Sequence, residues 1–225
     1  AIVWAAPPEA FVSAMWPALT GGAPHVPAVA AIGIAPPSLA PAPDPGWSIR
    51  PVPYTGGAFG TLPSTNAKIA VINWYTVGLY PMGESPASIT VTPTLRAPAS
   101  WKHGGALDVA SVDGDTIRYA PTSLEMLNDH PVLLGEHFRS ITLWPAGSPA
   151  GEHVIDVVAD SEWALQFPQA RIDIYKKIVL EERAVFGGVG HYRKYHWLLT
   201  LSDNLGSFGV EHHECADDRV AENTF

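Results

Sequence analysis

The sequence predicts a mostly β fold with an α+β C-terminal part. From about residue 54, short runs of β-branched and aromatic residues alternate with clusters of Gly, Pro, Asp and Ser, which is typical of antiparallel sheets. Near residue 168 the apolar period changes from two residues to about 3.6, which indicates a helix. The 225 residues suffice for one large domain or two small ones.

Residues 1–50 differ from the rest in composition. They hold 10 Pro and 13 Ala but only three charged side chains. Because proline removes a backbone donor and biases the preceding residue to extended conformations, we expect residues 1–53 to form an Ala/Pro-rich irregular segment.

Two origins of this segment are open, a changed reading frame in a GC-rich gene or a divergent extension. Comparing the three frames of the coding DNA distinguishes them.

Residues 54–160 read as an antiparallel β-sandwich-like domain. Its predicted strands are 68–77, 88–92, 107–110, 116–119, 140–144 and 153–158. The first of these is rich in β-branched and aromatic residues and is followed by Pro81, so it reads as a well-buried strand. One or two helical turns are predicted at 121–127, with Thr122 as N-cap and Glu125 three positions later.

Residues 161–225 read as a helix followed by a hairpin. The helix begins at Pro168 and ends at Gly187 and Gly188. Its predicted apolar face holds Ala170, Ile174, Ile178 and Val185 with their neighbours Tyr175, Val179 and Phe186. The alternation over 195–201 predicts a strand. After a turn at 202–206, we expect residues 208–212 to return as an edge strand.

Charge and composition exclude several classes of partner. The net charge is −9 and no run of basic residues occurs, so nucleic acid and anionic membrane surfaces are poor partners. Proline interrupts every apolar stretch before it reaches the length of a membrane span, so we expect a soluble protein. Cys215 is the single cysteine, which excludes an intrachain disulfide.

Residues with the chemistry for catalysis or metal binding crowd into the last 35 residues. They are His191, His196, Glu211, His212, His213, Glu214, Cys215, Asp217 and Asp218. Their spacing matches no metal motif, because neither H-E-x-x-H nor C-x-x-C occurs. On a strand, His212 and His213 point to opposite faces, and His191 and His196 read as loop and surface-strand residues. The spacing by itself is equally consistent with Glu211 as an ordinary solvated carboxylate on an edge strand.

Other catalytic motifs are missing from the sequence. No G-x-S-x-G occurs, and the Gly-rich piece at 187–190 follows a helix, whereas a phosphate-binding loop precedes one. Composition and spacing alone therefore predict a β-rich domain joined to the start of an α+β unit.

A family resemblance extends this interpretation, and it covers about residues 56–225. The residues that carry it are Ile72-Asn73-Trp74, Asp129-His130-Pro131-Val132, Gly135-Glu136-His137-Phe138-Arg139, Phe186-Gly187-Gly188, His191-Tyr192, the stretch 195–203, the stretch 208–214 and Asp217-Asp218-Arg219. Together they resemble the glycyl aminopeptidase family of zinc metallopeptidases, which belong to the thermolysin-like gluzincins.

The resemblance implies an N-terminal β domain followed by a thermolysin-like catalytic domain, of which this chain holds the first helix and hairpin. The family's zinc ligands lie on an H-E-x-x-H helix and a downstream Glu, and this sequence reaches Phe225 without that motif. The resemblance therefore implies zinc in the parent enzyme but assigns no catalytic residue and no metal ligand here. It implies that Gly209, Val210, Glu211 and His212 form the substrate strand, with Glu211 holding the free amine.

We therefore expect the N-terminal portion of a zinc-dependent aminopeptidase that cleaves small N-terminal residues, glycine or alanine, from peptides. Its partners would be a peptide with a free N-terminus and the remainder of the catalytic domain. The 225-residue chain by itself is expected to lack peptidase activity and tightly bound zinc. The alternative is a non-catalytic β-rich binding or interaction module. A downstream H-E-x-x-H in the gene favours the enzyme, and a stop codon after residue 225 favours the module.

Overall fold

A computed structural model describes residues 64–76, 78, 83–188 and 190–225. The irregular segment expected over residues 1–53 lies outside the described residues, and so do residues 54–63. The described part is mostly β with few helices, as the sequence predicts.

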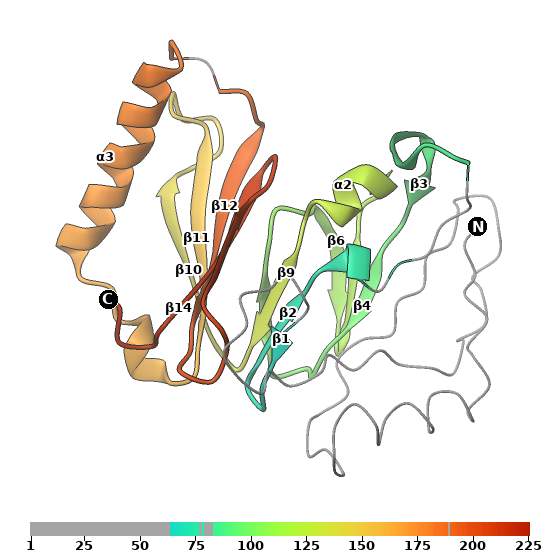
Figure 1. Cartoon of the computed structure of the whole chain (residues 1–225), viewed down its shortest axis with the longest axis horizontal. Coiled ribbons are helices and arrows are strands. Elements are labelled where there is room, and N and C mark those ends of the chain that lie inside the picture. The colour runs from blue at the N-terminus through green and yellow to red at the C-terminus, as the bar shows by residue number, and fades with distance from the viewer. Residues whose placement is uncertain (1–63, 77, 79–82, 189) are drawn as a thin grey trace.

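The described chain forms four layers (Figure 1). The first is a three-stranded sheet in the order β4 (Thr94–Arg96), β7 (Thr116–Tyr119) and β6 (Val109–Asp113). The second is a four-stranded sheet in the order β1 (Ser64–Thr65), β2 (Ile69–Ile72), β9 (Val132–Gly135) and β5 (Lys102–Gly104). The third is a five-stranded sheet in the order β10 (His137–Trp144), β11 (Glu152–Ala159), β12 (Lys194–Leu201), β14 (Cys215–Val220) and β13 (Phe208–Glu211). Helix α3 (Gln169–Val185) is the fourth layer.

A hydrophobic core fills each space between consecutive layers. On β2, Ala70 and Ile72 belong to the core shared with the three-stranded sheet, whereas Ile69 and Val71 belong to the core shared with the five-stranded sheet. Successive side chains of a strand point to opposite faces, so burial of both faces requires a continuous apolar run. This explains the sequence of β2.

Short elements connect these layers. They are the two-residue strands β3 (Thr90–Val91) and β8 (Thr122–Ser123), helix α2 (Leu124–Asn128) and three 3-10 turns at Trp74–Thr76, Pro86–Ser88 and Glu162–Leu165. The prediction of Thr122 as N-cap is wrong. Thr122 pairs with Val91 in the β3–β8 ladder, and Ser123 caps α2 by accepting a hydrogen bond from the Met126 amide at 3.1 Å.

The five-stranded sheet corrects the predicted hairpin. β13 is an edge strand, as expected, but it pairs antiparallel with β14 and not with β12. β14 lies between them and pairs parallel with β12, which in turn pairs parallel with β11. Strand β14 was not predicted, because its sequence is Cys-Ala-Asp-Asp-Arg-Val and charged residues are unusual in an inner strand. Asp217 and Arg219 satisfy each other there, with Arg219 Nη2 2.6 Å from Asp217 Oδ2.

Helix α3 spans most of the predicted helix and ends at the predicted glycines, with Gly187 at φ +74° and Gly188 at φ +79°. Its buried face differs in part from the expected one. Val179 packs against the five-stranded sheet as expected, and so does Ile172, which was not expected there. Ile174 and Val185, which were expected to be buried, are 56% and 80% exposed.

The boundary expected at residue 160 stays a prediction, and strands on both sides of it share the five-stranded sheet. Within the described part of the chain, no helix combines the length and the hydropathy that a membrane span requires.

Candidate functional site

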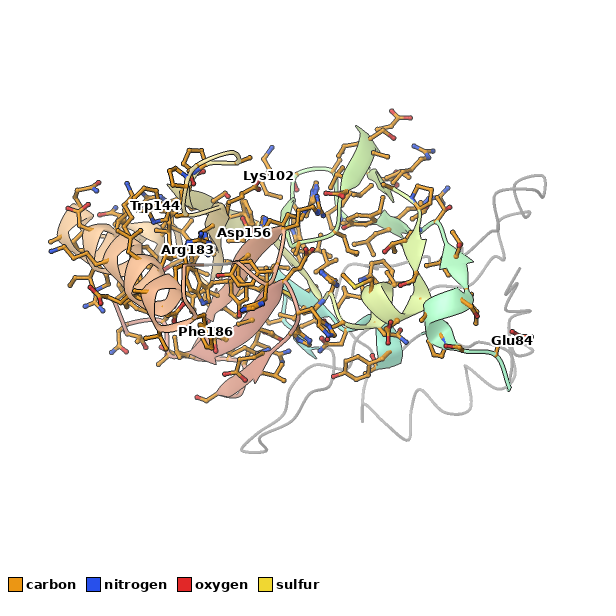
Figure 2. All side chains as sticks on the ribbon, turned by 90° about the horizontal axis from the view of Figure 1, so that it is seen from above. Glu84, Lys102, Trp144, Asp156, Arg183 and Phe186 are labelled. Atoms are coloured by element: carbon orange, nitrogen blue, oxygen red, sulfur yellow. The ribbon has the colours of Figure 1, made fainter. Side chains whose placement is uncertain are left out.

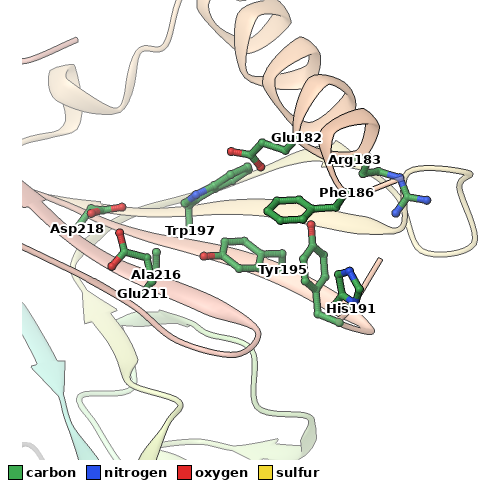
Figure 3. A pocket seen from close by; sticks show the side chains of 10 residues that line it. Glu182, Arg183, Phe186, His191, Tyr195, Trp197, Glu211, Ala216 and Asp218 are labelled. Atoms are coloured by element: carbon green, nitrogen blue, oxygen red, sulfur yellow. The ribbon is translucent and has the colours of Figure 1, made fainter. Parts of the chain in front are cut away.

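A pocket of about 480 Å³ lies between the C-terminal end of α3 and the edge of the five-stranded sheet (Figure 3). Figure 2 shows Arg183 and Phe186 at this end of the helix. The lining residues come from α3, the following loop and the strands β12, β13 and β14: Glu182, Arg183, Phe186, His191, Tyr192, Tyr195, Trp197, Glu211, Ala216 and Asp218.

The strand register brings the sheet residues of the pocket together. Ala216 lies beside Trp197 of β12 and opposite Glu211 of β13. Gly209 lies opposite Asp218, so Glu211 and Asp218 share the face that looks toward α3. A Cβ atom at Gly209 would lie 3.2 Å from Asp218 Oδ1, so glycine at this position leaves room for the carboxylate.

Negative charge predominates in the pocket. Its lining holds the carboxylates of Glu182, Glu211 and Asp218, against one guanidinium, that of Arg183. Arg183 also donates through Nη2 to the Gly188 carbonyl at 2.6 Å, where it holds the end of the helix. Burial, together with the nearby charges of Asp217 and Glu211, raises the pKa of Asp218. A cation entering the pocket would relieve this repulsion.

Aromatic rings form the walls. Tyr195 and Trp197 meet edge to face with ring centroids 5.3 Å apart. Burial raises the pKa of Tyr195, and the neighbouring charges of Asp218 and Glu211 act in the same direction, so its hydroxyl keeps its proton at neutral pH. In Figure 3 this hydroxyl points toward Glu211.

The Tyr192 hydroxyl has a fixed partner behind the pocket wall. His153, which is buried, has Nδ1 3.3 Å from the Gly151 carbonyl and Nε2 2.9 Å from the Tyr192 hydroxyl. Nδ1 therefore carries the proton, and the tyrosine hydroxyl donates to Nε2. An aromatic wall beside three carboxylates is suited to an ammonium group, which both kinds of neighbour attract.

The structure separates the four residues of the predicted substrate strand. Glu211 lines the pocket, and Gly209 lies opposite Asp218 on the same face. Val210 lies opposite the buried Asp217 on the other face of the sheet. His212 lies in the turn after β13, where its Nδ1 is 3.0 Å from Oδ1 of Asp129.

The expectation that His212 and His213 point to opposite faces of a strand is wrong, because β13 ends at Glu211. Both histidines contact the carboxylate of Asp129, and Nδ1 of His213 lies 2.6 Å from Oδ2.

His196 also differs from its predicted role as a surface-strand residue. Its side chain is 12% exposed, and Nδ1 lies 2.7 Å from Oδ2 of Asp156. His191 does lie in a loop, where its ring meets Phe186 edge to face at the pocket. Burial raises the pKa of the Cys215 thiol, with nearby Asp129 and Asp217 adding to the effect, so the thiol stays neutral.

The described residues do not fit a zinc site. Among them, no group of three or more His, Cys, Asp or Glu side chains is arranged to hold a metal ion. We therefore assign no metal ligand to this part of the chain.

Seven of the ten lining residues were not predicted from the sequence as site residues, and neither was His153 behind the wall. The seven are Glu182, Arg183, Phe186, Tyr192, Tyr195, Trp197 and Ala216. Tyr195 and Trp197 carry a signal in the alternation of β12, which places both on one face. Glu182 carries none, because only the packing of α3 on the sheet brings it to the pocket. His153 carries none either, because it lies behind the wall only through the pairing of β11 with β12, which sets it beside Tyr195.

Comparisons with known proteins agree with this fold. Residues 48–136 match the family model of the peptidase M61 N-terminal domain. Eleven chains of solved structures match. One is an aminopeptidase N family protein from Idiomarina loihiensis, with a TM-score of 0.50 and 16% sequence identity. The match covers 71% of this chain but 26% of that one. No curated protein matches the sequence.

The family match supports a relation to the N-terminal portion of a peptidase, and the structural match shows a shared fold. Asp129 and His130 lie inside the matched range of 48–136, whereas every pocket residue lies after it.

Proposed function

We propose that this chain is the N-terminal portion of a zinc-dependent aminopeptidase that removes small N-terminal residues such as glycine and alanine from peptides. In this proposal the pocket at Glu211 holds the free amine of the substrate. The observation that carries the proposal is the position of Glu211, at the edge of the five-stranded sheet and in a pocket with two further carboxylates and aromatic walls.

The position of Glu211 suits both the amine and the extended main chain of a peptide N-terminus. Its carboxylate can accept charge-assisted hydrogen bonds from an ammonium group. β13 is the last strand of its sheet within the described part of the chain, so an extended peptide can add to its outer edge through main-chain hydrogen bonds. The amine then lies where the sheet and the carboxylates meet.

The chain's own residues have binding and orienting roles in this proposal. Glu211 and Asp218 attract the ammonium, the Tyr195 hydroxyl offers a neutral hydrogen bond beside them, and Trp197 shields the site from water. Zinc would polarise the scissile carbonyl in the complete enzyme. No step of the reaction is assigned to the residues described here, because they form no metal site.

The test uses the complete protein with Glu211→Gln. This variant keeps the shape of the side chain but removes its charge, and a hydrogen bond to a charged group contributes about 1.5–3 kcal/mol. We expect kcat/KM for glycyl-nitroanilide to fall about tenfold to a hundredfold. The preference for the free amine over the N-acetylated substrate should collapse, while zinc content stays unchanged.

Glu181→Gln is the matched control, since it removes the same charge from an exposed position of α3 outside the pocket. Unchanged discrimination in Glu211→Gln would show that Glu211 does not hold the amine. A complete protein with no aminopeptidase activity would instead support the alternative of a binding module.

A further inference from the structure

We propose that Asp129 is a positioning residue for Glu211: it holds the β13–β14 turn, and this turn fixes the edge strand that presents Glu211 to the amine. The inference deepens the proposed function and rests on it for the role of Glu211. The contact between Asp129 and the turn is present in the structure whatever that role is.

Both carboxylate oxygens of Asp129 engage the turn. Oδ1 lies 3.0 Å from Nδ1 of His212, and Oδ2 accepts from the backbone amide of His213 at 2.8 Å. Oδ2 also lies 2.6 Å from Nδ1 of His213. A carboxylate only accepts hydrogen bonds, so both imidazoles donate. One side chain therefore receives three hydrogen bonds from two consecutive residues of the turn.

Neighbouring groups complete this attachment. The backbone carbonyl of Asp129 accepts a long hydrogen bond from the Cys215 thiol at 3.8 Å. His130 is buried, and its Nε2 lies 3.6 Å from a carboxylate oxygen of Glu214. Residues 129 and 130 thus contact four consecutive residues, 212 to 215, which span the whole connection between β13 and β14.

The turn is the nearest fixed point to Glu211. Glu211 is the last residue of β13, directly before His212, and β13 is bonded to the sheet on one side. The strand itself is four residues long, so its ladder with β14 supplies few hydrogen bonds. Glu211 itself pairs with Ala216, and the His212 amide next to it donates to the Cys215 carbonyl at 2.7 Å. The contacts of Asp129 with the next two residues therefore add to a short ladder that restrains Glu211.

The electrostatics of Asp129 support a strong attachment. Burial acts to raise its pKa, but the hydrogen bonds from the His213 amide and from the side chains of His212 and His213 outweigh burial and lower it. The carboxylate is therefore ionised, and its hydrogen bonds are charge-assisted. The His212 side chain is 9% exposed, so this part of the contact is shielded from water.

Asp129 also connects two parts of the chain that are distant in sequence. It follows α2, which packs in the core of the first two sheets, and His212 and His213 come 83 and 84 residues later. The N-terminal sheets thereby set the position of a residue in the pocket, although none of their residues lines it.

The experiment measures amide hydrogen exchange by NMR in the 225-residue chain, comparing wild type with Asp129→Ala and Asp129→Asn. We expect the β13 amides that pair with β14 to exchange about tenfold faster in Asp129→Ala, because the strand opens locally when its anchor is lost. Asp129→Asn keeps one carbonyl acceptor and should be intermediate.

Two controls separate positioning from general loss of stability. Glu125→Ala removes a carboxylate from the exposed side of α2, four residues before Asp129. Asn66→Ala removes a different contact to the five-stranded-sheet region, the 2.7 Å hydrogen bond from Asn66 Nδ2 to Asp160. Neither variant should loosen β13 selectively, although Asn66→Ala should lower the melting temperature.

A titration with glycinamide, and with N-acetylglycinamide as the blocked probe, completes the test on the same samples. Asp129→Ala should weaken glycinamide binding about tenfold and reduce its preference over the blocked probe. Unchanged β13 exchange in Asp129→Ala would overturn the inference, and so would faster exchange with unchanged glycinamide affinity. If the 225-residue wild type does not bind glycinamide, the same titration is made on the complete protein with and without Asp129→Ala. If the complete wild type does not bind it either, the amine site is wrong, and the exchange rates alone decide whether Asp129 fixes the strand.

Discussion

Asp156 of β11 shows how a single polar residue shapes the contact between the two larger sheets. Its side chain is buried and accepts hydrogen bonds from the Ser140 hydroxyl at 2.8 Å and from the Gly105 amide at 3.1 Å. Figure 2 shows Asp156 between the five-stranded sheet and the N-terminal sheets. With His196 at 2.7 Å, the carboxylate is well paired, as a buried charge requires.

Glycine at position 104 is a consequence of this arrangement. A Cβ atom there would lie 2.6 Å from both Cβ and Cγ of Asp156. These atoms are close to the backbone of an inner strand, so they cannot move aside freely. Nothing in the sequence indicates this contact, because it depends on two strands that are distant along the chain.

We therefore predict that Gly104→Ala destabilises the protein by about 1–3 kcal/mol, as other overpacked sites do. For a chain of this size, the melting temperature should fall about 2–4 °C for each kcal/mol. Gly190→Ala is the matched control, since its new Cβ would lie 3.0 Å from the end of the flexible Arg183 side chain and at an ordinary contact distance of 3.5 Å from the Tyr192 carbonyl oxygen. Equal melting temperatures for Gly104→Ala and wild type would contradict the close approach of Asp156 to residue 104.

At the scale of elements, α3 shows where sequence periodicity succeeds and where it stops. The period and the terminal glycines predict the helix and its end. The same period does not identify the buried face, because apolar residues occur on more than one side: Ile172 and Val179 face the sheet, whereas Ile174 is largely exposed. Only packing against the five-stranded sheet decides between these sides.

Strand β14 is an element that the sequence pattern does not predict. Its charged residues argue against an inner strand, and without it the sequence pairs β13 with β12. The fold accommodates these charges by pairing Asp217 with Arg219 on one face and by turning Asp218 into the pocket on the other. Glu211 was predicted as a site residue through family resemblance, whereas the pocket around it depends on β14 and α3.

A pair of substitutions on α3 tests the observed orientation of the helix. Val179 is 0% exposed, so Val179→Ala should destabilise by about 1–3 kcal/mol through lost apolar burial and a cavity. Ile174→Ala removes a larger side chain, but at 56% exposure it should change stability by less than about 0.5 kcal/mol. Urea unfolding of both variants measures the difference. A larger effect for Ile174→Ala would place the side of the helix that carries Ile174 against the sheet instead.

At the scale of the whole molecule, the spaces between the layers hold the hydrophobic cores, and the edge of the third layer forms the pocket that we propose as the amine site. Three hydrophobic cores hold the four layers together. The pocket at the edge of the third layer gathers three of the carboxylates of a chain whose net charge is −9. Glu182 and Glu211 are exposed, but Asp218 is partly buried near other carboxylates, which lowers stability when it is ionised. Binding sites commonly carry such strain because a ligand relieves it.

The pH dependence of stability measures how much the ionised Asp218 side chain destabilises the folded state. Burial, with Asp217 and Glu211 nearby, raises its pKa in the folded protein above the ordinary value of 3.8. The folded state therefore holds this proton more tightly than the unfolded state does. The destabilisation from ionised Asp218 is fully present above the folded pKa, and it disappears below the unfolded one.

We predict that Asp218→Asn raises the melting temperature relative to wild type at pH 7. The difference should shrink as the pH falls through the folded pKa of Asp218 and vanish below pH 3.8, where both states of the wild type are protonated. Thermal melts from pH 7 to pH 3 measure it. Asp113→Asn, on the exposed strand β6, controls for the loss of one negative charge and should change stability by less than about 0.5 kcal/mol. A lower melting temperature for Asp218→Asn at pH 7, or a gain that does not change with pH, would show that the carboxylates of the pocket do not strain the fold.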